Sequence, residues 1–176
     1  MRLGRVTVSA LLTVALGAGL EAGAEAGVQS GPSASLTPVT RHSGCHLHGS
    51  LPDHACTPGA RFTTVTTSMV CTPGYSRRVR HVTYAERSAV YAEYGMHRHF
   101  NGRNGEVDHF VPLELGGSND LANLWPESAT GGYGSGQKDR LENELHDEVC
   151  DGNLPLRRAE RLIAADWVKV YRSRFG

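Results

Sequence analysis

A carboxylate and an imidazole stand side by side in the stretch Glu-Val-Asp-His-Phe-Val-Pro-Leu at residues 106–113. The apolar surroundings indicate a strand, where two titratable groups are costly to bury without a purpose. Asp108 offers hard oxygen ligands for a divalent cation, and His109 can take a proton from water. Such a pair could catalyse hydrolysis, because a metal ion neutralises developing negative charge while the base activates the water. A His–carboxylate pair that serves only local structure is the alternative interpretation.

The residues downstream of this pair follow a pattern. Asn123 comes 14 positions after His109 (123 − 109), as the first residue of Asn-Leu-Trp-Pro, and a Lys-Asp-x-x-Glu-Asn block starts at Lys138. With these blocks, residues 51–171 resemble the HNH endonuclease family, and in particular a secreted bacterial subgroup of it. We therefore expect an enzyme, a metal-dependent endonuclease.

The resemblance implies a fold and a set of roles. The fold would be two antiparallel strands and a helix around one divalent metal ion: Mg²⁺, Mn²⁺ or Zn²⁺. Asp108 would bind the metal, His109 would be the general base, and Asn123 would hold the strand of His109 in position. The substrate would be the phosphodiester bonds of nucleic acid, with DNA favoured over RNA. A further metal ligand would come from the helix, where the resemblance favours Asn143 and metal chemistry favours His146.

Geometry adds one condition to this site. Neighbouring residues of a regular strand point to opposite faces. Asp108 and His109 can therefore share a site only if the strand is irregular there or ends there.

The elements that must position this pair can be predicted from apolar spacing and turn residues. We expect strands over 107–113 and 123–125, a turn at 116–120, and helices over 138–150 and from Pro155 onward. Leu141, Leu145 and Val149 recur every four residues on one face of the first of these helices.

Two further elements are expected upstream. Thr83 and Glu86 form a capping box, which predicts a helix over 84–94 that ends at Gly95. The stretch 62–70 is rich in Thr and Val and predicts a short strand. The predicted class is α+β: a ββα-metal unit at about 106–150, an N-terminal segment stabilised by disulfides, and a C-terminal helix.

The N-terminus has the features of an export signal. Residues 1–26 contain a short basic start, an apolar run and Ala-x-Ala sites, and the run is shorter than the ~20 residues of a membrane span. Residues 27–50 are rich in Ser, Gly, Thr and Pro and suggest a flexible linker. We expect a nuclease domain over 51–176, secreted and without membrane association once the signal is removed.

Export favours disulfides between the four cysteines, Cys45, Cys56, Cys71 and Cys150. Three pairings are possible, and we favour Cys56 with Cys71 because Thr-Pro-Gly follows each of them. The competing interpretation is a zinc site within residues 42–56, a segment that also carries several histidines.

The charge balance is neutral, with 18 Lys and Arg against 18 Asp and Glu. This balance weighs against a nucleic-acid binder, so phosphate contacts must come from local groups. The candidates are Arg77, Arg78, Arg80, Lys138 and Arg140. Two other functions stay open: a catalytically silent module that binds nucleic acid or a cell-surface partner, and a disulfide-rich structural protein. The oligomeric state stays open too.

Overall fold

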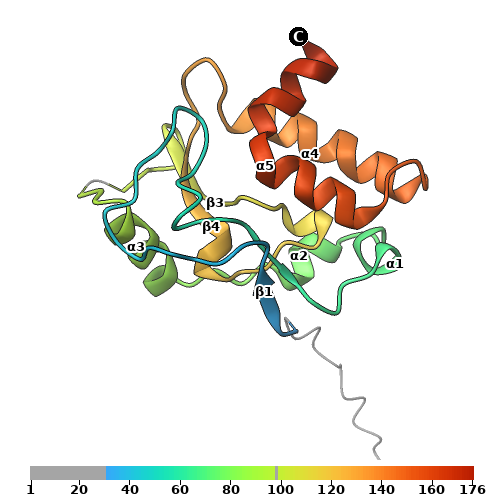
Figure 1. Ribbon diagram of the computed structural model, residues 1–176, viewed down its shortest axis with the longest axis horizontal. Helices are drawn as coiled ribbons and strands as arrows, with labels where there is room; N and C mark the ends of the chain where they lie inside the picture. The colour runs from blue at the N-terminus through green and yellow to red at the C-terminus, as the bar shows by residue number, and fades with distance from the viewer. Residues whose placement is uncertain (1–30, 98) are drawn as a thin grey trace, which may run out of the picture.

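The chain forms an α+β structure, shown in Figure 1. The computed structural model describes residues 31–97 and 99–176, and in that part of the chain it contains two small antiparallel sheets and five α-helices. The expected signal peptide and the first residues of the expected linker lie outside these ranges. No helix in the described part combines the length and the apolar character that crossing a membrane requires.

One sheet carries the Asp-His pair. Strand β3 (Gly105–His109) pairs antiparallel with β4 (Leu124–Ser128), so that Asp108 lies opposite Trp125. The first strand is shorter than predicted. It ends at His109, and the chain then continues through Pro112 into a 3-10 helix, η1 (Leu113–Leu115). The second strand follows a short 3-10 helix, η2 (Leu121–Asn123), and is longer than predicted.

The other sheet corrects two predictions. Strand β1 (Ser33–Ser35) pairs with β2 (Ala60–Phe62), so a part of the expected linker is folded onto the domain. The predicted strand over 62–70 ends at Phe62, and helix α1 (Thr67–Val70) follows. The physical reason is Thr66, whose hydroxyl accepts a hydrogen bond from the backbone N–H of Met69 and begins the helix.

Two helices follow α1 before the site strand. Helix α2 (Tyr75–Val79) is a single short turn, and α3 (Tyr84–Glu93) begins at the predicted capping box. In that box the Thr83 hydroxyl accepts from the Glu86 N–H, and the Glu86 carboxylate accepts from the Thr83 N–H. Gly95 has a φ of +63°, which suits the residue after a helix end, so this prediction is confirmed.

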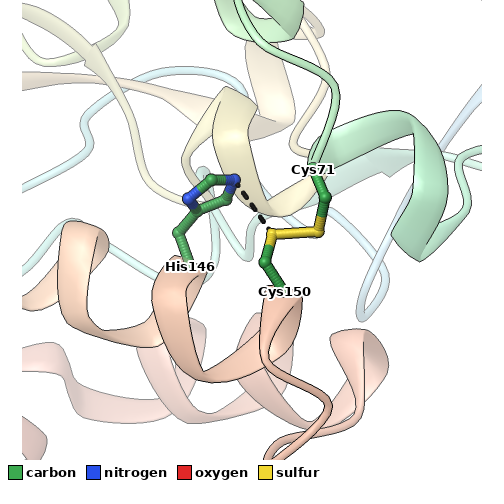
Figure 2. A group of neighbouring side chains, drawn as sticks. All are labelled: Cys71, His146 and Cys150. Carbon is green, nitrogen blue, oxygen red and sulfur yellow. Dashed lines mark hydrogen bonds between the residues drawn. A yellow bond between two sulfur atoms is a disulfide. The ribbon is translucent and has the colours of Figure 1, made fainter.

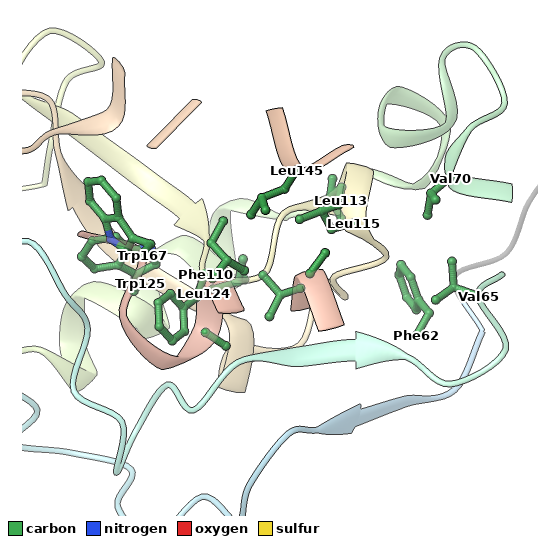
Figure 3. Close-up of a cluster of buried hydrophobic side chains, with 14 of the residues drawn as sticks. Phe62, Val65, Val70, Phe110, Leu113, Leu115, Leu124, Trp125, Leu145 and Trp167 are labelled. Atoms are coloured by element: carbon green, nitrogen blue, oxygen red, sulfur yellow. The ribbon is translucent and has the colours of Figure 1, made fainter. Parts of the chain in front are cut away.

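Two long helices complete the chain. Helix α4 (Ser135–Cys150) and helix α5 (Leu156–Phe175) lie side by side (Figure 1). The predicted apolar face of α4 is buried, and Ala159, Ile163 and Trp167 of α5 are buried with it. Figure 3 shows Leu145 of α4 and Trp167 of α5 among core side chains that include Leu113 and Leu115 of η1 and Trp125 of β4.

Two disulfides cross-link the chain, one between residues close in the sequence and one between distant segments. The bonds are Cys45–Cys56 and Cys71–Cys150, so the predicted pairing of Cys56 with Cys71 is wrong. Cys71 directly follows α1, which packs on α4, and this packing brings the Cα atoms of Cys71 and Cys150 to 5.6 Å. The Cys45–Cys56 bond also takes both cysteines away from a zinc site in residues 42–56.

Candidate active site

The Asp-His pair faces a small cavity at the end of β3. The cavity has a volume of about 50 Å³, and its lining includes Asp108, His109, Arg80, Glu114 and Glu142. Both members of the pair line it, and His109 is the last residue of the strand. A polar space of this size can hold a water molecule.

The His109 ring is held in one tautomer. Its Nε2 lies 3.0 Å from the Oδ1 of Asn119, whose Nδ2 donates to the Val79 carbonyl at 2.8 Å. Since that donation fixes which end of the amide is the oxygen, Nε2 of His109 must carry the proton. Nδ1 then bears the lone pair, and it has no hydrogen-bond partner among the described residues.

Burial controls the charge of this ring. The His109 side chain is 1% exposed, and its burial lowers the pKa to about 4, although Asp108 and the Asn119 hydrogen bond act in the other direction. His109 is therefore neutral at neutral pH. The neutral imidazole is the form that can accept a proton.

A fully buried ammonium lies beside the pair. Lys138 of α4 donates through Nζ to Oδ2 of Asp108 at 2.7 Å and to the carbonyl of His109 at 2.9 Å. It also contacts the carboxylate of Glu142, one helical turn further along α4. Lys138 therefore ties the end of β3 to α4. It is not available as the surface phosphate contact that the sequence suggested.

Three carboxylates surround this one ammonium: Asp108, Glu127 and Glu142. Burial raises the pKa of Glu127 to about 9 and that of Glu142 to about 8. Burial alone would raise the pKa of Asp108 as well, but Lys138 outweighs it and the pKa of Asp108 is lowered. Burial would lower the pKa of Lys138, and the three carboxylates raise it well above its ordinary value. The cluster therefore keeps a charged Asp108–Lys138 pair and holds protons on glutamates at neutral pH.

The donors at this site do not fit the divalent metal that the resemblance implies. Lys138 already pairs with the Oδ2 of Asp108, and the positive charge of its ammonium would repel a metal cation bound there. In the described part of the chain, the group whose ligand atoms lie within 4.8 Å of one another is Cys71, His146 and Cys150, not one around Asp108. Those two cysteines are bonded to each other, as Figure 2 shows, which removes the thiolates that a metal needs.

The two predicted helix ligands lie elsewhere. Asn143 is exposed and donates back along α4 to the Asp139 carbonyl at 2.8 Å. The Nε2 of His146 lies 3.1 Å from the Val70 carbonyl oxygen and 3.5 Å from the Cys150 sulfur (Figure 2). The residue of α4 that lines the cavity is Glu142. The i,i+4 spacing of Lys138 and Glu142 was the sequence signal for it, since it puts both on one helix face.

Asn123 holds the loops around the site together. Its Oδ1 accepts from the backbone N–H groups of Ala60 and Val111 at 3.1 and 2.8 Å. Its Nδ2 donates to the carbonyls of Val111 and Ser118 at 2.9 and 2.8 Å. The backbone oxygen of Asn123 also accepts from the Phe110 N–H at 2.7 Å, next to His109. This buried side chain therefore fixes the chain on either side of the cavity and does not touch the His109 ring.

The remaining basic candidates have different surroundings. Arg77 and Arg78 are exposed on α2, and Arg80, just after it, lines the cavity. Arg140 lies with its guanidinium 4.0 Å from the centre of the Phe175 ring. Only Arg80 of the predicted set can therefore meet a ligand in the cavity directly.

Comparisons with known proteins found no match to a family model, a curated protein or a solved structure.

Proposed function

We propose that this chain is a secreted phosphodiester hydrolase of the HNH type that cleaves DNA, with RNA as the alternative to be tested. One observation carries the proposal: His109 is neutral, has its tautomer set by Asn119, and lines a cavity that can hold a water molecule. In this proposal, β3, β4 and α4 correspond to the ββα unit of the family. The two disulfides are consistent with an oxidising compartment.

The proposed reaction uses the chain's own groups. In this proposal a water molecule reaches the buried Nδ1 of His109 from the cavity, attacks phosphorus and gives its proton to that Nδ1, while the bond from phosphorus to the 3′ oxygen breaks. Glu142 lines the cavity, and burial raises its pKa to about 8, so at neutral pH it carries a proton that it can give to the leaving oxygen.

Positive charge at the phosphate comes from Arg80 in this mechanism. Arg80 is exposed, lines the cavity, and has no carboxylate within ion-pair distance in residues 31–97 and 99–176. A guanidinium binds two phosphate oxygens at once. The buried Lys138 neutralises Asp108, which would otherwise repel the anionic substrate.

The test is cleavage of supercoiled plasmid DNA, with RNA in a parallel reaction, by the purified protein and by His109→Ala. We expect the variant to lose activity by roughly 10²–10⁴-fold, the usual contribution of a general base. His81→Ala is the matched control, because it removes an exposed neighbouring histidine and should cleave normally. Circular dichroism must show both variants folded. Near-normal cleavage by folded His109→Ala would refute the mechanism.

The same assay tests whether cleavage requires a metal ion. Because Lys138 already supplies the cation beside Asp108, we expect cleavage to persist in EDTA. Loss of cleavage in EDTA and its recovery with Mg²⁺, Mn²⁺ or Zn²⁺ would instead show that cleavage requires a metal ion and would contradict this expectation.

A second function is favoured by the same lysine. The ion pair of Lys138 with Asp108, together with the neutral net charge, also suits an HNH-like module that binds nucleic acid or a partner without cleaving. Binding of the plasmid with no cleavage under any of these conditions would favour that module.

A further inference from the structure

A larger cavity opens next to the candidate active site. It has a volume of about 310 Å³ and lies between α3, the loop before β3 and the first residues of β3. This volume falls at the lower end of the roughly 300–1,000 Å³ of small-molecule sites. The side chains that matter for its chemistry are Arg80, Arg87, Tyr91, Phe100 and Glu106.

The two cavities are adjacent. Arg80 lines both of them. Glu106 and Val107 line the larger cavity and directly precede Asp108 in β3. A polymer with one phosphate at His109 would therefore place a neighbouring unit in the larger cavity.

The cationic groups of the larger cavity are free to bind an anion. In the described residues, neither Arg80 nor Arg87 forms an ion pair with a carboxylate. Arg87 donates through Nη2 to the Val82 carbonyl at 2.6 Å, which holds its guanidinium in place and leaves other N–H groups for a ligand.

The wall of this cavity is aromatic. The Tyr91 ring is buried, stacks on His99 at 4.2 Å between centroids, and meets the Phe100 ring edge-on at 6.1 Å. Phe100 is only half-buried, so its ring can pack against a flat ligand. Gly105 makes room for it, since a Cβ there would lie 2.6 Å from the Phe100 ring.

We infer that this cavity binds a nucleotide unit of the substrate, with its phosphate on Arg80 and Arg87 and its base against Phe100. Exposed Glu106 can accept a hydrogen bond from a base N–H group. Stacking on an aromatic ring tolerates any base, so the subsite favours a nucleotide without selecting a sequence. The inference rests on the proposed function for its place in the reaction, but binding itself does not require cleavage.

The experiment is a calorimetric titration of the full chain with thymidine 5′-monophosphate. We expect saturable binding, weakened about tenfold by Arg87→Ala and about tenfold by Phe100→Leu, which keeps the apolar volume but removes the aromatic face. Arg103→Ala is the matched control. Arg103 is an exposed arginine of the same loop that does not line the cavity, and its removal should leave the affinity unchanged.

A kinetic assay on a short oligonucleotide separates this inference from the proposed function. Arg87→Ala should raise KM about tenfold with little change in kcat, because it removes binding and leaves His109 in place. Absence of nucleotide binding, or equal affinities of Arg87→Ala and Arg103→Ala, would overturn the subsite even if the protein cleaves DNA. Nucleotide binding by a protein that does not cleave would retain the subsite and reject the hydrolase.

Discussion

Glu127 is the buried acid of β4 for which sequence analysis found no role. Its side chain is 1% exposed, and its Oε1 has no hydrogen-bond partner among the residues that the structure describes. Burial is the largest cause of its raised pKa, and the neighbouring carboxylates add to it. A carboxyl in this setting is most stable when it carries a proton.

This protonation makes stability depend on pH. The pKa of Glu127 rises from 4.5 to about 9 on folding. The contribution of the protonated Glu127 to the free energy of unfolding is therefore complete below pH 4.5 and is lost as the pH rises towards 9. Glu127→Gln, a neutral substitute for the protonated acid, should come within about 1 kcal/mol of the wild type at pH 5 and be clearly more stable at pH 9. Urea unfolding at both pH values measures the difference. The idea fails if the two proteins lose stability in parallel between pH 5 and pH 9.

The two site residues of β3 could be predicted from the sequence, but the burial of Lys138 could not. Asp108 and His109 were singled out because charge in an apolar strand is unusual, and the structure puts both at one cavity. Lys138 was predicted to contact phosphate, which requires an accessible ammonium, but the structure buries it completely. Its burial depends on three carboxylates from two strands and a helix, and this convergence is not visible in any one segment.

At the scale of elements, Asn123 connects η2 and β4 to the loops that flank the cavity. Asn123→Ala would leave the N–H groups of Ala60 and Val111 and the carbonyls of Val111 and Ser118 without partners. We expect a loss of about 3–5 kcal/mol in the free energy of unfolding. Asn143→Ala is the control, because an exposed helix position should change stability by no more than about 0.5 kcal/mol. Denaturant unfolding measures the free energy of unfolding of both variants. Similar values would refute this role for Asn123.

The three longer helices were predicted better than the strands, for a physical reason. Caps and apolar spacing are local signals, and they located α3, α4 and the start of α5. Strand length depends on partners elsewhere in the chain. The end of β3 is set by hydrogen bonds of Val111 to Asn123, and β1 finds its partner across a long loop.

At the scale of the whole molecule, the two disulfides close loops of very different size. Cys71–Cys150 spans 79 residues, and Cys45–Cys56 spans 11. From loop length alone, the first bond should contribute roughly 4.5 kcal/mol and the second roughly 3 kcal/mol. Thermal unfolding of Cys71→Ala/Cys150→Ala and of Cys45→Ala/Cys56→Ala measures this. The larger loss should belong to the first variant, and the reverse order would show that packing around Cys45 and Cys56 outweighs chain entropy.

The pairing itself could not be predicted. Thr-Pro-Gly after both Cys56 and Cys71 suggested a local bond, but Cys71 meets the end of α4 through the packing of two helices. Long-range pairing of this kind depends on the finished fold. The residues around Cys71 and Cys150 in the sequence therefore do not predict that they pair.

The bond between Cys71 and Cys150 turns the middle of the chain into a covalent ring. Every residue assigned above to catalysis or nucleotide binding lies inside that ring, from Arg80 to Glu142. A protease that cuts the exposed glycines at 131–132 would open the ring and release nothing, because both pieces stay joined through sulfur. Outside a cell, where proteases are common, a protein nicked in this way would keep its site in one molecule, and only a reducing agent would separate the fragments.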